Sequence, residues 1–124
     1  MKSRLSLAAI ILVLGLAAPA TAGPYEDASD AYVNGRYETA LRLWQPLADQ
    51  GHPGAQYGLG LLYDMGRGVA KSSVMAHMWF DLSAAQSNPS AARSRDTIAR
   101  HMTSTQITEA QKRAREWHEQ RSGQ

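Results

Sequence analysis

Four histidines are the first residues in this sequence whose side chains could do chemistry. His77 and Asp81 stand at i and i+4, a spacing that places both side chains on one face of a helix. A zinc site needs three or four converging ligands, and no second histidine, cysteine or carboxylate pair of similar spacing lies nearby in the sequence. We therefore interpret His77 and Asp81 as a hydrogen-bonded pair on the surface and expect no metal site.

Motifs for catalysis are also missing from the sequence. It has no cysteine and no Gly-x-Ser-x-Gly element that could present a nucleophile. Gly66-Arg67-Gly68 resembles the start of a phosphate loop, but the Gly-Lys-Ser/Thr ending is missing and an expected helix, not a strand, precedes it. We interpret this segment as a turn, and we predict a protein that is not an enzyme and takes no cofactor.

The first 22 residues have the layout of a secretory signal peptide. Lys2 and Arg4 supply the positive start, residues 5–18 form the apolar core, and Ala20-Thr21-Ala22 supplies small residues for cleavage. This apolar run is shorter than the roughly 20 residues that a membrane-spanning helix needs. We expect cleavage after Ala22 and a periplasmic protein, with an uncleaved membrane tether as the alternative. Without cysteine, the chain is not a lipoprotein and has no disulfides.

Removal of the signal peptide changes the charge balance. The 13 basic residues of the whole chain fall to 11 without Lys2 and Arg4, and these equal the 11 acidic residues. A neutral chain does not imply nucleic acid as a partner. The charges are unevenly distributed, however, because residues 23–88 contain seven acidic and four basic residues, while residues 89–124 contain four acidic and seven basic ones. As a rival to the binding of a partner, this distribution suggests that the basic tail packs across the acidic face, within one molecule or between two.

An internal repeat organises the elements that carry these side chains. Tyr32-Val33-Asn34-Gly35 recurs as Tyr63-Asp64-Met65-Gly66, and Leu41-Arg42-Leu43-Trp44 recurs as Ala76-His77-Met78-Trp79. The tyrosines are 31 residues apart and the tryptophans 35 apart, so the second unit has four more residues in its turn. Each unit is predicted to be a helix, a turn and a second helix.

Capping residues indicate where helices begin and end. Pro53 suits the first position of a helix, Gly66 suits the left-handed residue that ends it, and Ser72 or Ser73 suits the start of the next. Asn88-Pro89 and Thr103-Ser104-Thr105-Gln106 open two further helices, the second through a capping box. No segment alternates with period two, so the sequence predicts an all-α fold of about six helices.

Apolar residues at helical spacing identify the core of the second unit. Met75, Met78, Trp79 and Leu82 form the stripe expected to face inward. Phe80 lies next to Trp79 on the adjoining face, and we expect its side chain to be partly exposed.

The second unit resembles a known repeat. Residues 55–69, followed by Ala76-His77-Met78-Trp79 and Ser83-Ala84-Ala85, are similar to the Sel-one-like repeat, a relative of the tetratricopeptide repeat. The first unit matches in part, because Pro24, Ala28 and Ser29 stand where alanine, leucine and glycine are expected. The resemblance implies a short α/α superhelix with a degenerate repeat at residues 23–51, a complete repeat at 52–88 and a two-helix C-terminal cap at 89–124.

The same resemblance implies a binding surface. In superhelices of this kind the first helix of each pair lines the concave side. The corresponding positions of this chain are Glu26, Asp30, Val33 and Asn34 in the first unit and Tyr57, Leu61, Asp64 and Met65 in the second. We predict an acidic groove with apolar patches that prefers a basic or amphipathic segment of a protein partner.

These features favour a protein–protein interaction module or adaptor in the bacterial periplasm. Two alternatives stay open from the sequence. One is a hydrolase acting on cell-wall or β-lactam substrates, an activity suggested for cysteine-rich relatives whose disulfides this chain lacks. The other is a self-associating structural protein.

Overall fold

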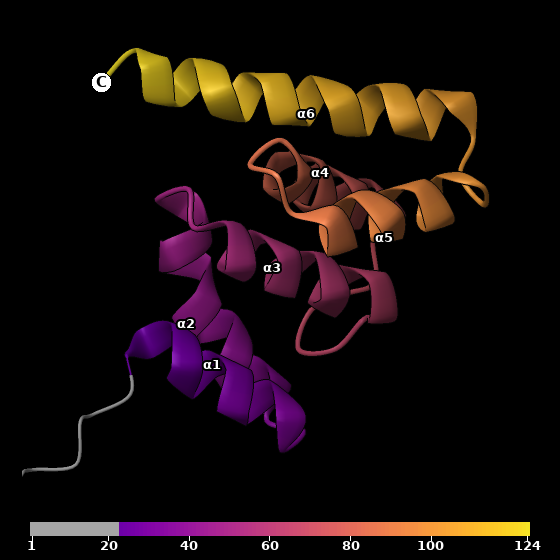
Figure 1. Cartoon of the computed structure of the whole chain (residues 1–124). Coiled ribbons are helices and arrows are strands. Elements are labelled where there is room, and N and C mark those ends of the chain that lie inside the picture. Colours follow the sequence, from indigo (N-terminus) through magenta and orange to yellow (C-terminus); the bar gives the residue numbers. More distant parts are fainter. Residues whose placement is uncertain (1–22) are drawn as a thin grey trace, which may run out of the picture.

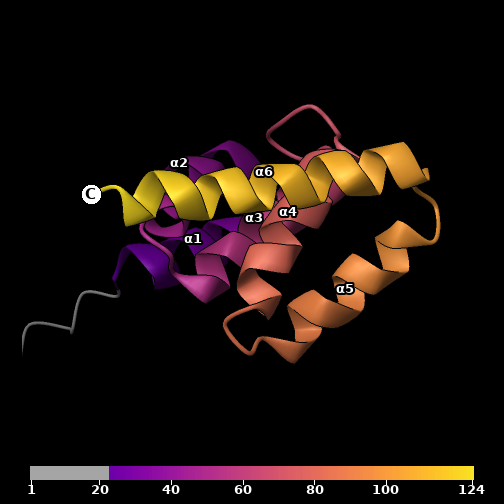
Figure 2. The same ribbon diagram turned by 90° about the horizontal axis from the view of Figure 1, so that it is seen from above.

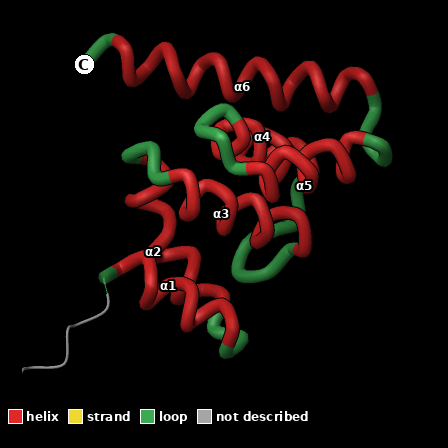
Figure 3. Tube along the Cα trace, viewed as in Figure 1, coloured by secondary structure: helices red, strands yellow, loops and turns green. Residues whose placement is uncertain are grey.

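The computed structural model describes residues 23–124, and the predicted signal peptide, residues 1–22, lies outside the described residues. Six helices with connecting loops, and no strands, make up the described part (Figures 1 and 3). They are α1 (Pro24–Val33), α2 (Tyr37–Asp49), α3 (Pro53–Met65), α4 (Ser73–Ala84), α5 (Pro89–Ala99) and α6 (Ser104–Ser122). The predicted all-α superhelical fold is confirmed. None of these helices has the length and apolar character required to cross a bilayer.

The predicted helix boundaries are confirmed where the sequence has capping residues. Pro53 is the first residue of α3, and Gly66 ends that helix in the left-handed region at φ 62°. The Ser72 hydroxyl accepts a hydrogen bond from the Met75 N–H at the start of α4. Asn88 caps α5 through its side-chain oxygen. These side chains satisfy N–H groups that have no partner within the helix.

The capping box of α6 is also confirmed. The Gln106 N–H donates to the Thr103 hydroxyl at 3.1 Å, and the Thr103 N–H donates to the Gln106 side chain at 2.9 Å. Because two free N–H groups are satisfied reciprocally, this cap fixes the first turn of the longest helix.

Each repeat unit is a pair of packed helices, α1 with α2 and α3 with α4. The units are joined by the packing of α2 on α3. The loop between the helices of the second unit, residues 66–72, is four residues longer than the turn of the first unit, residues 34–36. The longer loop reaches back to the first unit, where Gly68 lies so close to the backbone of Tyr37 that a Cβ atom would come within 2.9 Å of its carbonyl.

Two glycines of α3 allow aromatic rings from both neighbouring helices to approach it closely. Trp44 of α2 packs on Gly58, and Phe80 of α4 packs on Gly60. Phe80 is fully buried, so the expectation that it is partly exposed was wrong. Gly60 leaves room for the ring, and Tyr57 covers it with ring centroids 5.7 Å apart.

The two C-terminal helices do not form a third pair of the same kind. α5 packs on α4, as α3 packs on α2, whereas the main partner of α6 is α4 rather than α5 (Figure 2). Ala114 of α6 joins the main core, and the Trp117 ring lies beside Gly51 in the loop between α2 and α3. α6 therefore lies across the second helix of the complete unit and reaches the junction of the two units.

Candidate functional site

The predicted groove residues of α1 lie on the surface. Glu26, Asp30 and Asn34 are exposed, and the Asn34 side-chain amide donates to the Asp30 carbonyl oxygen at 2.7 Å. Val33 is the most exposed large apolar residue in the described range, with 81% of its surface accessible. None of the ion pairs found in residues 23–124 involves an acidic residue of α1. This helix therefore presents free negative charge beside an exposed apolar side chain.

The predicted groove residues of α3 are less free than expected. Tyr57 and Leu61 are half-buried against a second core cluster of Ala76, Phe80 and Ile98. Asp64 is half-buried and Met65 is 51% exposed. Tyr57 and Leu61 thus form the floor between α3 and its neighbours, whereas Asp64 and Met65 remain available to a partner.

A cavity of about 250 Å³ lies between α3 and α5. Tyr57 and Asp64 line it from α3, and Ser90, Arg93, Ser94, Thr97 and Ile98 line it from α5. Two residues of the predicted groove are therefore brought together, but the opposite wall comes from a helix that we had assigned to the cap. This wall contributes an arginine, so the cavity is not purely acidic.

The sequence held a signal for this contribution from α5. Pro89 begins α5 as Pro53 begins α3, and the buried residues Ala91 and Ile98 follow at the same spacing as Ala55 and Leu62. α5 therefore matches the first helix of a further unit at its buried positions. The face predicted for the first helices therefore continues from α3 onto α5, which line one cavity.

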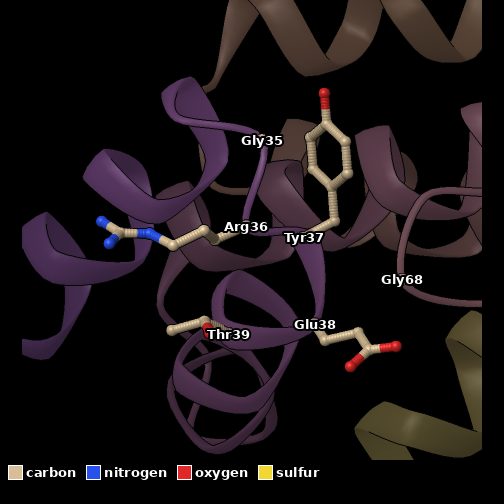
Figure 4. Close-up of a pocket in the computed structure, with 6 residues that line it drawn as sticks. All are labelled: Gly35, Arg36, Tyr37, Glu38, Thr39 and Gly68. Atoms are coloured by element: carbon tan, nitrogen blue, oxygen red, sulfur yellow. The ribbon is translucent and has the colours of Figure 1, made fainter.

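A larger cavity, of about 440 Å³, lies at the start of α2. Gly35, Arg36, Tyr37, Glu38, Thr39 and Gly68 line it, and Figure 4 shows the Arg36, Tyr37 and Glu38 side chains pointing in different directions. The Arg67 guanidinium lies over the Tyr37 ring, 4.9 Å from its centre. Because the polar groups diverge, this cavity has no arrangement for binding one reacting atom.

His77 is not the surface residue that the sequence predicted. It is 4% exposed, and its Nδ1 atom has no hydrogen-bond partner among the described residues. Asp81 instead accepts a hydrogen bond from Arg95 of α5 at 2.9 Å. Burial lowers the pKa of His77 below its ordinary value, and the negative charge of Asp81 opposes this shift only in part. Within residues 23–124 no group of three or more potential ligands is placed to hold a metal ion.

The basic C-terminal part does not pack across the acidic α1 helix of the same molecule. The ion pairs of α6 are internal, Lys112 with Glu116 and Arg113 with Glu109. Arg95 makes the one ion pair that links residues 89–124 to residues 23–88 within the described range, through Asp81. The rival idea that the tail packs across the acidic helix inside one molecule was therefore wrong.

Comparison with known proteins identifies the repeats. The model of the Sel1 repeat matches residues 29–52 and again residues 53–88. No curated protein and no solved structure matches the chain. Sel1 repeats form helical superhelices and are generally protein–protein interaction modules, typically without catalytic activity. The chain, with two such repeats in tandem, is a Sel1-like repeat protein.

Proposed function

We propose that this protein is a periplasmic adaptor or regulator that binds a segment of a partner protein on the face formed by α1, α3 and α5. The repeat family supports binding of a protein. The signal-peptide layout of residues 1–22 supports export.

The observation that carries this proposal is the placement of Val33 and Met65. They are the two large apolar residues that are exposed in residues 23–124, and each is the last residue of the first helix of its unit. The loop that follows Met65 reaches the start of α2, where Gly68 touches Tyr37 just after the turn that follows Val33. Both side chains therefore lie at the same end of the two units. Scattered apolar residues on a surface are ordinary, but two at one end of a repeat face provide an anchor for a partner.

Charge determines which partner fits this anchor. Glu26, Asp27 and Asp30 are exposed on α1, in the same helix as Val33. A segment with both apolar and basic side chains satisfies the apolar anchor and the acidic helix together. The partner is thus a basic, amphipathic segment.

Site-specific crosslinking in the native envelope tests the contact. A photoreactive residue at position 33 or 65 is expected to give the same discrete crosslinked product, and one at position 115 on the exposed side of α6 is expected to give none. Asp30→Lys should weaken the product, whereas Asp49→Lys, a matched reversal of an exposed charge on α2, should not. Equal products from positions 65 and 115 would overturn the proposed face.

Export is tested separately. Fractionation of the envelope and the mass of the protein should give a soluble periplasmic chain that begins at Gly23. A chain that retains residues 1–22 and stays with the membrane would replace the soluble adaptor by a tethered one, and a chain found only in the cytoplasm would reject the location.

The hydrolase alternative gains no support from the two cavities described above. Neither cavity is lined by a histidine or by two carboxylates, the groups that commonly activate a nucleophile or a water molecule. Self-association between molecules remains an outcome that the crosslinking experiment detects, because the product would then contain two copies of this chain.

A further inference from the structure

We propose that the cavity between α3 and α5 recognises two oppositely charged side chains of the bound segment. A basic side chain pairs with Asp64, and an acidic side chain pairs with Arg93. This inference rests on the proposed function, because the cavity lies on the same face, but it concerns a different set of residues. It adds an acidic group to the basic, amphipathic partner described above.

The two charged groups share one cavity without neutralising each other. Asp64 and Arg93 both line it, yet neither takes part in an ion pair among the described residues. The Arg93 guanidinium donates one hydrogen bond at 3.1 Å to the Ser90 hydroxyl of its own helix. This bond orients the guanidinium, and its other N–H groups remain free for an acceptor.

The charges lie toward opposite ends of the cavity. Tyr57 and Asp64 are seven residues apart on α3, about 10 Å along a helix axis at the usual rise. Arg93 follows Pro89 by four residues, as Tyr57 follows Pro53, and α3 and α5 run in the same direction in Figure 1. Arg93 therefore corresponds to Tyr57 in its position along the helix, and Asp64 lies about two turns further along. From this correspondence we infer that the two charges lie toward opposite ends of the cavity.

The lining between these ends suits a polar peptide backbone. Tyr57 and Ile98 give an apolar floor, and Ser94 offers a hydroxyl. The Thr97 hydroxyl is already engaged, since it donates to the Arg93 carbonyl oxygen at 2.9 Å. Asp64 is half-buried, which strengthens its charge interactions relative to open water, whereas Arg93 is exposed. Together the two charges can discriminate between segments that the apolar anchor alone would accept.

Chain geometry gives the spacing of the two charges on the partner. An extended segment advances about 3.3 Å per residue, and the flexible side chains of lysine and glutamate extend the reach further. Opposite charges two or three residues apart therefore span the cavity. A segment with only basic residues would place a cation beside Arg93, which is unfavourable.

Binding of blocked glycine-serine peptides to the mature protein tests the inference. One peptide carries lysine and glutamate two residues apart, a second has them in reverse order, and others have glutamine in place of one or both. A further peptide has the same two charges too far apart to span the cavity. Fluorescence anisotropy of a label at one end measures affinity, with amide shifts of Tyr57 and Thr97 to locate the site.

The expected result is that each charge contributes about two- to fivefold to affinity, as partly exposed ion pairs do, and that the widely spaced peptide loses the gain of one charge. Asp64→Lys should remove the contribution of the peptide lysine only, and Arg93→Glu that of the glutamate only. In the double variant Asp64→Arg with Arg93→Asp, any preference of the unaltered protein between the two peptide orders should be reversed.

Equal affinity for all peptides, or an order preference that the double variant leaves unchanged, would overturn the two-charge reading. The proposed function would survive that result if the crosslinks from positions 33 and 65 persisted. If those crosslinks were absent while the peptides still showed the charge dependence, the proposed function would fail and the two-charge proposal would stand. Circular dichroism of each variant shows whether the fold is retained.

Discussion

The ring of Phe80 lies against Gly60, in the space where any other residue would carry its Cβ atom. Trp44 has the same relationship to Gly58 from the opposite neighbour of α3, where a Cβ atom would lie 2.6 Å from the indole. Helix α3 is thus held between two aromatic rings, one from each adjacent helix. Its position determines both the anchor at Met65 and the wall of the α3–α5 cavity.

Gly60→Ala is expected to destabilise the protein, although alanine is the better helix former by about 1 kcal/mol. The added methyl group meets the buried Phe80 ring, and overpacking costs about 1–3 kcal/mol. For a domain of this size a net loss of about 1 kcal/mol lowers the Tm by about 4–8 °C in thermal unfolding. Gly123→Ala, at the exposed end of α6, is the control and should leave the Tm unchanged. An unchanged or higher Tm for Gly60→Ala would contradict the close contact.

His77 predicts a loss of stability in mild acid. Its pKa is lowered in the folded protein, chiefly by burial, while Asp81 and Asp96 raise it and Arg95 lowers it. As the pH falls through 6.5, the ordinary pKa of histidine, the unfolded chain takes up a proton that the folded chain resists. The free energy of unfolding should therefore fall as the pH is lowered from 7.5 toward 5.5 in urea titrations. At pH values above the pKa of His77 in both the folded and the unfolded chain, this residue causes no loss of stability.

Two variants identify the residue responsible for this pH dependence. His77→Leu removes the titrating group and should flatten the stability between these pH values. His118→Gln changes an exposed histidine of α6 and should leave the dependence in place. If His77→Leu kept the full dependence, another group would have to carry it.

The ion pair between Asp81 and Arg95 is expected to hold α5 on α4. The side chains are about one-third exposed and 2.9 Å apart, so solvent screening limits their coupling to about 0.5–1 kcal/mol. A double-mutant cycle of Asp81→Asn and Arg95→Gln in urea unfolding measures it. Asp81→Asn should also lower the pKa of His77 further, since it removes a nearby negative charge, and the His77 ring signals in NMR report that shift. A coupling near zero would mean that the apolar contacts of Ala91 and Ile98 suffice.

Trp117 is expected to hold the C-terminal half of α6 to the body. Its ring is half-buried beside Gly51, and the Arg121 guanidinium lies 4.5 Å from its centre. Trp117→Ala should make amide hydrogens of the last turns of α6 exchange roughly tenfold faster, because about 1–2 kcal/mol of apolar burial is lost. Amides of α3 should be unaffected. Glu119→Ala, on the exposed side, is the matched control, and equal exchange in both variants would place the attachment elsewhere.

Helix boundaries and the repeat were predictable because local chemistry determines them. Pro53, Gly66, Asn88 and the Thr103 capping box act within one turn of the chain, and the longer loop of the second unit follows from counting residues. Such features depend little on what packs against the helix. The Sel1 match agrees with them.

Burial and contact at the site were less predictable because they depend on helix crossing. Phe80 is buried because Gly60 of another helix leaves space for it. His77 is buried, and its expected partner Asp81 pairs with Arg95 of α5 instead. Periodicity along α4 identifies its faces but not which neighbours cover them. The role of α5 was missed for the same reason, since α5 and α6 were assigned together as a cap although only α5 continues the face of first helices.

The loop contact between Gly68 and Tyr37 makes the folding of the first unit depend on the second. Trp44 packs on Gly58, and the start of α2 packs on Gly68. The first unit is therefore completed by residues that follow it in the chain. Two short helices with mostly alanine at their buried positions bury too little apolar surface to persist alone. The N-terminal unit therefore depends on the second, and it becomes stable only once the chain as far as residue 68 is free to fold.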